Sequence, residues 1–327
     1  MVTQFLFFFY SLIYKQYISS NLNFTFTKYV KISNRKYITN NNNKSDTLSH
    51  YLAGLLEGDG HLSVPKISTP KDKLRTAFVE VLFAFKDKPS ADLLKSIFGG
   101  NVYKRGNAVR WMIQDKGSII KIINSINGKF RTPKIKALYD MIDYLNFKGQ
   151  DIMKLPLDTS PLVSNAWLAG FIDSDGSFMI KGFPVSDSIN KGLRSYIALQ
   201  FYLPQRIQDV SGESLEPVMQ NIADFLQVKL NNRDFKGKFH QYIVNTSNNQ
   251  SNLILINYLN TFHLLSSKYL DYKDWEKAYN LFSKKLYKNP VHYEEIRELK
   301  FNMNKNRTSF SWSHHKTNVY DIKNLSL

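Results

Sequence analysis

Cysteine is absent from the 327-residue chain, and glycine is scarce at 15 residues. The absence of cysteine excludes disulfides, cysteine-based zinc sites and thiol catalysis. No apolar run reaches the roughly 18 residues that a membrane-spanning helix needs. The apolar stretch Phe5–Tyr14 is too short, and no basic residues precede it as they would in a secretory signal. We therefore expect no membrane partner.

Acidic residues are also missing from the first 45 positions, which carry six basic residues and several serines. An acid-free, basic start of this kind is typical of a mitochondrial transit segment. A disordered leader that ends in the asparagine run Asn40–Asn43 explains the same composition. Residues 1–46 are therefore interpreted as a basic leader that is either disordered or removed, and the expected location is the mitochondrial matrix.

The whole chain is strongly basic, since 44 Lys and Arg residues oppose 27 Asp and Glu residues and give a formal charge of +17. Such an excess in a globular protein indicates a polyanionic partner, either nucleic acid or an anionic membrane surface. Aromatic residues reach 14% and hydrophobic residues 43%, which is enough for a substantial core. Most of the aromatic side chains are expected in that core rather than on a base-stacking surface.

Five of the 15 glycines fall in two related nine-residue segments, Leu52–Gly60 (LAGLLEGDG) and Leu168–Gly176 (LAGFIDSDG). Five of the nine positions are identical, and an aromatic residue precedes each copy, Tyr51 in the first and Trp167 in the second. The copies lie 116 residues apart, which is too long for a solenoid repeat. The spacing indicates a small half-domain that has been duplicated once.

The two repeated segments are expected to be helices that pack against each other. Small residues four positions apart, such as Gly54 and Gly58, share one helix face and allow two backbones to come close. Ser49 and Asn165 are candidate caps at the helix starts, and Gly60 and Gly176 are candidate terminators.

If the two helices run in the same direction, the carboxylates of Asp59 and Asp175 converge at their ends. Acids there face an unfavourable helix dipole and repel each other, and a divalent cation relieves both penalties. Oxygen ligands with room for water suit Mg²⁺, with Mn²⁺ as a substitute. Gly58 and Ser174, which precede the two acids, complete the candidate metal site.

Both halves are expected to follow one order: the motif helix, two strands, a helix, a two-stranded hairpin and two helices. In the first half the elements after the motif are His61–Lys66, Thr76–Phe85, Ser90–Phe98, Asn101–Arg105, Ala108–Ile113, Ser118–Ile126 and Pro133–Asn146. In the second half they are Ser177–Lys181, Arg194–Leu203, Leu215–Leu226, Val228–Arg233, Phe239–Asn245, Asn252–Asn260 and Ser267–Phe282.

The domain boundaries follow from this order. The first half covers residues 47–147, a linker with Gly149, Pro156 and Pro161 covers 148–163, and the second half covers 164–283. Residues 284–327 form a basic tail with one helix expected near Tyr293–Met303, and its His314-His315 pair is expected to be exposed and polar.

The two segments closely resemble the LAGLIDADG motif of homing endonucleases and the related intron maturases, and the match extends over about residues 48–285. Two motifs in one chain are similar to the single-chain members of that family. The tail stretch Leu299–Arg307, followed by Phe310 and Trp312, resembles the fungal mitochondrial intron-encoded branch.

The resemblance implies an α+β fold of two pseudo-symmetric αββαββα halves, packed through the LAGLIDADG helices, each offering a curved antiparallel sheet to the DNA major groove. It also implies that Asp59 and Asp175 bind metal for catalysis, with Glu57 and Asp173 in supporting roles. A basic residue near each scissile phosphate is the family's further catalytic group, and Lys134 and Lys268 are the candidates here. The alternative for each lysine is an ordinary solvated residue at the start of a helix.

Residues that read bases are expected on the outward faces of the strands. The strand Arg194–Leu203 alternates apolar and polar residues, and an antiparallel sheet with one packed face leaves the other free. Arginine and glutamine suit guanine and adenine edges in the major groove. Ordinary solvated strand faces remain the alternative. The candidates are Arg105, Arg110, Gln114, Arg194, Gln200, Tyr202, Lys238 and His240.

The leading functional hypothesis is a site-specific, Mg²⁺-dependent double-strand DNA endonuclease that acts as a monomer on a long, non-palindromic target, leaves 3′ overhangs and promotes homing of a mitochondrial group I intron. The motif copies differ at Gly58 and Ser174, which favours an asymmetric target. The second hypothesis is a maturase that binds group I intron RNA, with or without nuclease activity. A repressor-like DNA-binding module is the third, and only the basic charge supports it.

Overall fold

The computed structural model describes residues 43–65, 76–182, 197–234, 237, 240–316 and 320. Residues Lys44–Leu327 belong to one compact unit. The expectations for the leader up to residue 42, for Arg194 and for Lys238 lie outside the described residues. Within the described ranges, no helix combines the length and apolarity that crossing a bilayer requires.

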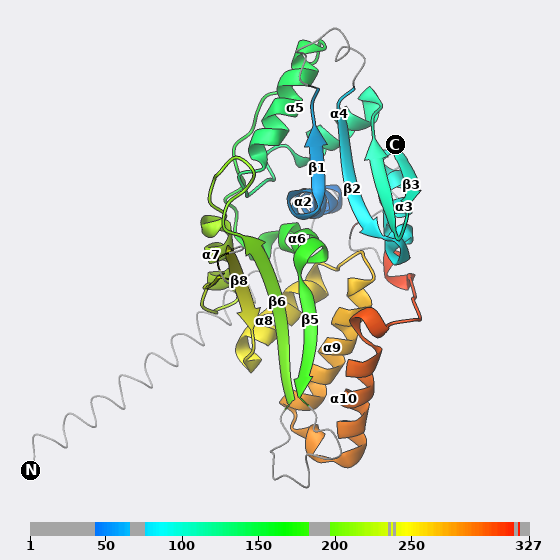
Figure 1. Ribbon diagram of the computed structural model, residues 1–327, viewed down its shortest axis with the longest axis vertical. Coiled ribbons are helices and arrows are strands. Elements are labelled where there is room, and N and C mark those ends of the chain that lie inside the picture. The colour runs from blue at the N-terminus through cyan, green and yellow to red at the C-terminus, as the bar shows by residue number, and fades with distance from the viewer. Residues whose placement is uncertain are drawn as a thin grey trace, which may run out of the picture. The chain divides into compact units, whose positions relative to one another are not determined.

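Two four-stranded antiparallel sheets with the same strand order are the frame of the molecule. The first has the order β1-β2-β4-β3 and the second the order β5-β6-β8-β7 (Figure 1). The strands of the first are β1 (Gly60–Ser63), β2 (Phe78–Ala84), β3 (Asn101–Arg105) and β4 (Ala108–Ile113). Those of the second are β5 (Ser177–Gly182), β6 (Ile197–Arg206), β7 (Asn231–Asp234) and β8 (His240–Thr246). The shared order confirms the duplicated half.

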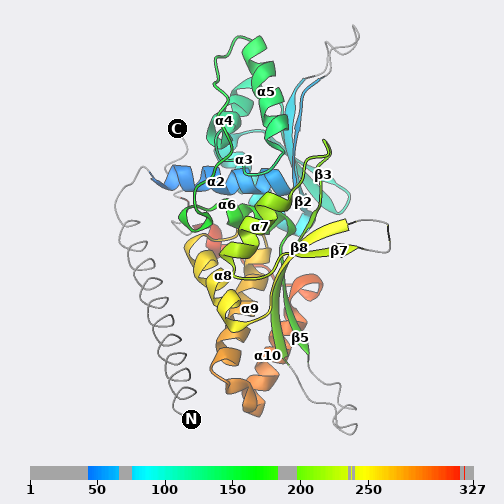
Figure 2. The same cartoon turned by 90° about the vertical axis from the view of Figure 1, so that its left-hand side faces the viewer.

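Helices accompany each sheet in matching positions, and Figure 2 shows α4, α5, α8 and α9 on one side of the strands. The first half contains α2 (Asn43–Gly58), α3 (Lys88–Phe98), α4 (Lys116–Ile126) and α5 (Ile135–Phe147). The second half contains α6 (Trp167–Asp175), α7 (Glu216–Phe225), α8 (Asn249–Thr261), α9 (Lys268–Ser283) and the additional α10 (Pro290–Asn302). The α+β class with two αββαββα halves is confirmed; α5 follows that order in the first half, and α9 and α10 follow it in the second.

Alternation along β6 follows the sequence pattern. Leu199, Phe201 and Leu203 are buried at 3% exposure or less, whereas Gln200 and Tyr202 between them lie on the half-buried outward face. A strand whose side chains alternate in this way packs one face against helices and leaves the other accessible. The expected division of this strand into a core face and an outward face is therefore confirmed.

One expected strand end was wrong. The strand was expected to stop at Leu203, before a proline that cannot donate to the ladder. Instead β6 continues through Pro204 to Arg206, pairing Gln205 with Tyr242 and Arg206 with Gln241 of β8. The extension carries Gln205 to the centre of the molecule, where it matters for the site described below.

The expected helix ends also need correction. Helix α2 begins at Asn43, so Ser49 lies inside it and is not its cap. Asn165 does act at the start of α6, since its Oδ1 accepts the Trp167 N–H at 3.0 Å. Gly176 is extended, with φ −74° and ψ 156°, so it does not use the left-handed conformation of a helix terminator. A Cβ there would lie 2.8 Å from Ile172 Cγ2, so glycine is required for space.

The tail also departs from expectation. His314 is only 3% exposed, so the His314-His315 pair is not a solvated surface feature. Its ring stacks on Tyr269 with the centroids 4.3 Å apart. Helix α10 begins at Pro290, three residues before the expected start, with the Asn289 side chain accepting the Val291 N–H. The residues after α10 therefore pack against the second half.

Candidate active site

Helices α2 and α6 touch through their glycines at the centre of the molecule (Figure 1). A Cβ on Gly54 would lie 2.0 Å from the Trp167 carbonyl oxygen, and one on Gly170 would lie 1.9 Å from that of Tyr51. Farther along, a Cβ on Gly58 would lie 1.8 Å from the Ser174 hydroxyl. The matched order of these contacts means that the helices run side by side in one direction, as the sequence predicts.

This packing brings Asp59 and Asp175 to the same end of the helix pair. The position that a Gly58 Cβ would occupy is 3.0 Å from Asp175 Oδ2, so the second acid lies against the end of the first helix. Asp59 follows the last residue of α2, and its N–H still donates to the Leu55 carbonyl at 3.0 Å. Two carboxylates from different halves therefore share one site.

The earlier acid of each motif is buried and binds backbone N–H groups of its own half. Glu57 accepts the N–H groups of Arg131 at 2.8 Å and Thr132 at 2.6 Å. Asp173 accepts those of Leu265 at 2.6 Å and Ser266 at 3.0 Å. These acids therefore fix two loops, the first acid-binding loop (residues 129–132) and the second acid-binding loop (residues 263–266).

The aromatic residue before each motif crosses to the other half. Trp167 Nε1 donates to Glu57 Oε2 at 2.5 Å, and the Tyr51 hydroxyl donates to Asp173 Oδ2 at 2.5 Å. Burial raises the pKa of Glu57 to about 7, and hydrogen bonds from Thr132, Trp167 and Arg131 oppose that rise. The sequence shows the aromatic pair, but only the structure reveals that it joins the halves through their acids.

Lys134 and Lys268 reach the site but contact main-chain oxygens. Lys134 Nζ donates to the carbonyls of Leu56 at 2.9 Å, Gly58 at 3.3 Å and Gly60 at 2.9 Å. Lys268 Nζ donates to the carbonyls at 172, 173 and 174 at 2.9, 2.8 and 3.1 Å. Each ammonium thus satisfies the terminal carbonyls of a motif helix and interacts favourably with the negative end of its dipole.

The charged form of Asp59 is disfavoured at this site, and a bound metal ion would stabilise it. Although the Asp59 side chain is exposed, desolvation by the surrounding protein and then the charge of Asp175 raise its pKa to about 6. Lys268 and Lys134 oppose this rise, and burial lowers the pKa of both lysines. Bringing a divalent cation between two such carboxylates removes their repulsion.

The donor set fits a hard cation that keeps much of its water. Among the described residues, no group of three or more His, Asp or Glu side chains converges in a metal-binding arrangement. Asp59 and Asp175 therefore supply two carboxylates rather than a closed cage. Mg²⁺ is commonly held by one or two carboxylates together with waters and substrate phosphate oxygens.

Gln205 is a site residue that the sequence analysis missed. Its Nε2 donates to Asp175 Oδ2 at 2.7 Å. The strand register identifies the residue of the first half that corresponds to Gln205. The last glycine of each motif is the reference point: Gly60 pairs with Val81, and extending the β5–β6 pairing by one residue sets Gly176 opposite Leu203. Two residues further on stand Phe83 in one half and Gln205 in the other, so the two acids have unlike neighbours. The sequence signal for Gln205 was its position in phase with the apolar face of β6, where a polar side chain is unexpected.

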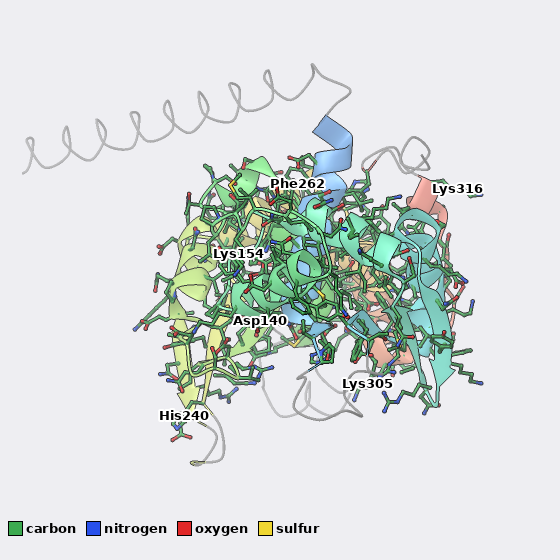
Figure 3. The ribbon with its side chains drawn as sticks, turned by 90° about the horizontal axis from the view of Figure 1, so that it is seen from above. Asp140, Lys154, His240, Phe262, Lys305 and Lys316 are labelled. Carbon is green, nitrogen blue, oxygen red and sulfur yellow. The ribbon has the colours of Figure 1, made fainter. Side chains whose placement is uncertain are left out.

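Of the remaining candidates on the sheets, Arg110 keeps the expected outward face, but the expectation for His240 was wrong. His240 is in phase with the buried Val244 and Thr246 of β8, on the face that continues the buried face of β6. Arg110 lies on the outward face of β4, where its Nε is 2.6 Å from Glu80 Oε2. Arg105 and Gln114 are exposed, and His240 is exposed at the start of β8, at the far tip of the hairpin in Figure 3. Base contact by these residues stays a prediction, and the Arg110–Glu80 pair means that Arg110 must leave a partner before it contacts a base.

Comparison with known proteins agrees with this geometry. Residues 52–145 and 168–279 match the model of the family described as LAGLIDADG endonuclease. The chain belongs to the LAGLIDADG endonuclease family. Each matched stretch of this LAGLIDADG protein contains one motif helix and most of the half that follows it.

Curated relatives of this LAGLIDADG chain are encoded by fungal introns. It is 32% identical to the intron-encoded DNA endonuclease aI3 of Saccharomyces cerevisiae, over 88% of this chain and 80% of that protein. It is 30% identical to an uncharacterised cox1 intron-2 protein of Schizosaccharomyces pombe, over 77% and 71% of the two chains. A shorter match of 32%, over 39% of this chain and 19% of that protein, is to the RNA maturase bI4 of S. cerevisiae.

Solved structures share the LAGLIDADG fold. The meganuclease I-SmaMI bound to uncleavable DNA matches with a TM-score of 0.60 at 22% identity, covering 79% of this chain and 97% of that one. The homing endonuclease I-GzeII in complex with its DNA target matches with a TM-score of 0.58 at 18% identity, covering 80% and 99%. These likenesses extend over both halves.

Proposed function

We propose that this protein is a site-specific double-strand DNA endonuclease that hydrolyses one phosphodiester in each strand and promotes homing of the intron that encodes it. The observation that carries the proposal is the convergence of Asp59 and Asp175 at the ends of two helices in glycine contact. The relative aI3 is named a DNA endonuclease, and the solved structures with this fold hold DNA.

Mg²⁺ is the proposed metal, with Mn²⁺ as a substitute, bound by Asp59 and Asp175 beside Gly58 and Ser174. When bound, the metal would supply Lewis-acid stabilisation of charge on the phosphate and activation of a water. Gln205 orients the Asp175 carboxylate through its 2.7 Å hydrogen bond. Lys134 and Lys268 hold the helix ends that present the two acids, and their positive charge would stabilise negative charge that develops on a phosphate bound there.

The proposed substrate is a long, non-palindromic duplex. Each sheet would cover about one helical turn of ~10 base pairs, and the paired acids would lie over the minor groove between the two half-sites. Across that groove the nearest phosphates are offset towards the 3′ side, so cutting both strands leaves 3′ overhangs. Two motifs in one chain make a monomer sufficient, and the intron-encoded relatives support action in the mitochondrial matrix.

A maturase role is the second candidate, and the match to the RNA maturase bI4 favours it. A plasmid carrying the intronless exon junction, incubated with Mg²⁺, separates the two functions. Linearisation by the natural protein and none by Asp175→Asn supports the nuclease. No cutting together with tight binding of the intron RNA would overturn the nuclease proposal and leave the maturase.

The Asp175→Asn result has a matched check in Asp209→Asn, which changes a half-buried aspartate in the β6–α7 connection. The Asp209 carboxylate accepts hydrogen bonds within its own loop, from the N–H groups of Ser211 and Glu213 and from the Ser211 hydroxyl. Cutting at the natural rate is expected from this control. Equal loss of cutting in both variants would mean that negative charge in general, rather than the central pair, supports activity.

A further inference from the structure

In each half, the segment that follows the last helices returns to the acid-binding loop. In the first half this segment is the linker, residues 148–163. The Asp158 N–H donates to the Phe130 carbonyl at 2.8 Å, and the Asp158 carboxylate pairs with Arg131 at 2.7 Å. The Arg131 N–H in turn donates to Glu57. The linker thus supports the loop that binds the first motif's buried acid.

In the second half the same place is taken by the tail strap, defined here as Arg307–Lys316 together with Tyr320. His315 Nε2 lies 2.7 Å and His314 Nε2 lies 3.2 Å from the Leu265 carbonyl oxygen. Because a carbonyl oxygen only accepts, each imidazole donates from Nε2. The N–H of Leu265 donates to Asp173 at 2.6 Å. One residue of the second acid-binding loop is therefore held by the strap on one side and by the acid on the other.

Tyr320 provides a second route from the strap to the same acid. Its side chain is 1% exposed, and its hydroxyl donates to the His263 carbonyl in the second acid-binding loop. Its ring lies 5.4 Å from that of Tyr51, whose hydroxyl donates to Asp173. The strap therefore contacts the donors of the Asp173 carboxylate in two ways: through the histidines at Leu265 and through Tyr320 at Tyr51.

The strap is anchored at its beginning and also reaches the first half. Arg307 Nε donates to Asp271 at 2.8 Å and its Nη2 donates to Asp274, both on α9. Lys86, just after β2, lies 5.8 Å from the Phe310 ring. Lys305 and Lys316, which bracket most of the strap, lie at different edges of the molecule in Figure 3.

The consequence is confined to one motif. Asp173 lies two residues before Asp175, and Lys268, which closes the same helix end, begins α9 directly after this loop. We propose that the tail strap positions the second motif's acid and lysine, so that His314, His315 and Tyr320 are positioning residues for cleavage of one DNA strand. This inference rests on the proposed nuclease function.

Strand-resolved kinetics test the proposal on the full-length protein. Single-turnover cleavage of a duplex with each strand separately labelled gives two rate constants, and their ratio is independent of the fraction of folded enzyme. His315→Ala and Tyr320→Phe are expected to slow one strand about fivefold to tenfold relative to the other, since small misplacement of reacting groups costs rates of this order or more. His315→Gln, which keeps a donor near the Nε2 position, is expected to restore the ratio.

Two comparison variants sharpen the result. Asp158→Asn weakens the linker's hold on the first acid-binding loop, so it is expected to shift the ratio in the opposite direction. His292→Ala removes a histidine of α10 that contacts Glu295 at 3.2 Å, and it should leave the ratio unchanged. Amide hydrogen exchange at Leu265 and Ser266, measured without DNA, should accelerate in His315→Ala and not in His292→Ala.

The outcomes are distinct. A parallel fall of both strand rates in the strap variants, or an unchanged ratio, overturns the positioning role. Unchanged amide exchange at Leu265 and Ser266 also overturns it, because the strap would then not hold the loop. If the natural protein cuts neither strand, the proposed nuclease function fails instead, while the exchange experiment still decides whether the strap supports the second acid-binding loop.

Discussion

Replacing Gly54 by alanine tests the central helix contact. The added Cβ would lie 2.0 Å from the Trp167 carbonyl oxygen, whereas real contacts of this kind essentially never fall below 3.0 Å. The obstacle is backbone, so no side-chain rotation relieves it, and α2 and α6 must move apart. Overpacking a tight interface costs about 1–3 kcal/mol, and this contact belongs at the upper end. Alanine's better helix propensity offsets about 1 kcal/mol.

We therefore expect Gly54→Ala to lower the free energy of unfolding by about 2 kcal/mol, a factor of about 30 in the folding equilibrium. Because the helix ends carry Asp59 and Asp175, cleavage should fall by about two orders of magnitude in the folded enzyme. Urea unfolding followed by circular dichroism measures the first effect, and cleavage kinetics measure the second.

Gly117→Ala is the matched control, since Gly117 also lies in a helix, α4, and the nearest atom to its added Cβ is 3.7 Å away. There only the helix propensity changes, so stability should stay level or rise by up to about 1 kcal/mol. If Gly54→Ala were as stable and as active as Gly117→Ala, the reasoning from the glycine contact would be refuted.

Three further results are expected. Glu57→Gln leaves two backbone N–H donors facing an amide in a buried site, so the free energy of unfolding should drop by about 2 kcal/mol in urea titrations, whereas exposed Glu213→Gln should change it little. Burial, with the neighbouring His315, lowers the pKa of His314 to about 4. In the unfolded chain the His314 imidazole protonates near pH 6.5. The contribution of neutral His314 to the free energy of unfolding is therefore complete above pH 6.5 and is lost as the pH falls towards 4. A His314→Gln variant should show a flatter pH profile of the melting temperature, and an equally steep one would contradict this. DNA affinity should fall steeply with salt because counterions are released on binding, and a flat dependence in a fluorescence anisotropy titration would exclude the basic surface as the binding site.

Much of the fold could be predicted because its signals are local. Alternation along β6 and the repeated segment each depend on neighbouring residues. The glycine spacing also predicted a contact between distant segments, because a helix face without side chains has few other uses. Asp59 and Asp175 followed from that contact.

The missed features depend on long-range geometry. Gln205 was missed because the strand was expected to end at Leu203, although the ladder continues through Pro204 to Arg206. The lysine positions were predicted, yet each lysine contacts three carbonyls that lie 74 or more residues away in sequence, so these contacts depend on where the distant helix end is placed. The buried place of His314 was unpredictable, because a polar pair in a basic tail carries no sign of the carbonyl that it will contact.

The exchange of Tyr51 and Trp167 between the halves has a consequence for synthesis. Glu57 leaves the ribosome 110 residues before Trp167, the residue whose indole N–H it accepts. During that interval the Glu57 carboxylate lacks one of the donors that it has in the complete structure. The acid of the first motif therefore acquires its final environment only when the second motif docks. An interruption of synthesis between the halves would therefore leave the buried acid of the first motif without its indole donor.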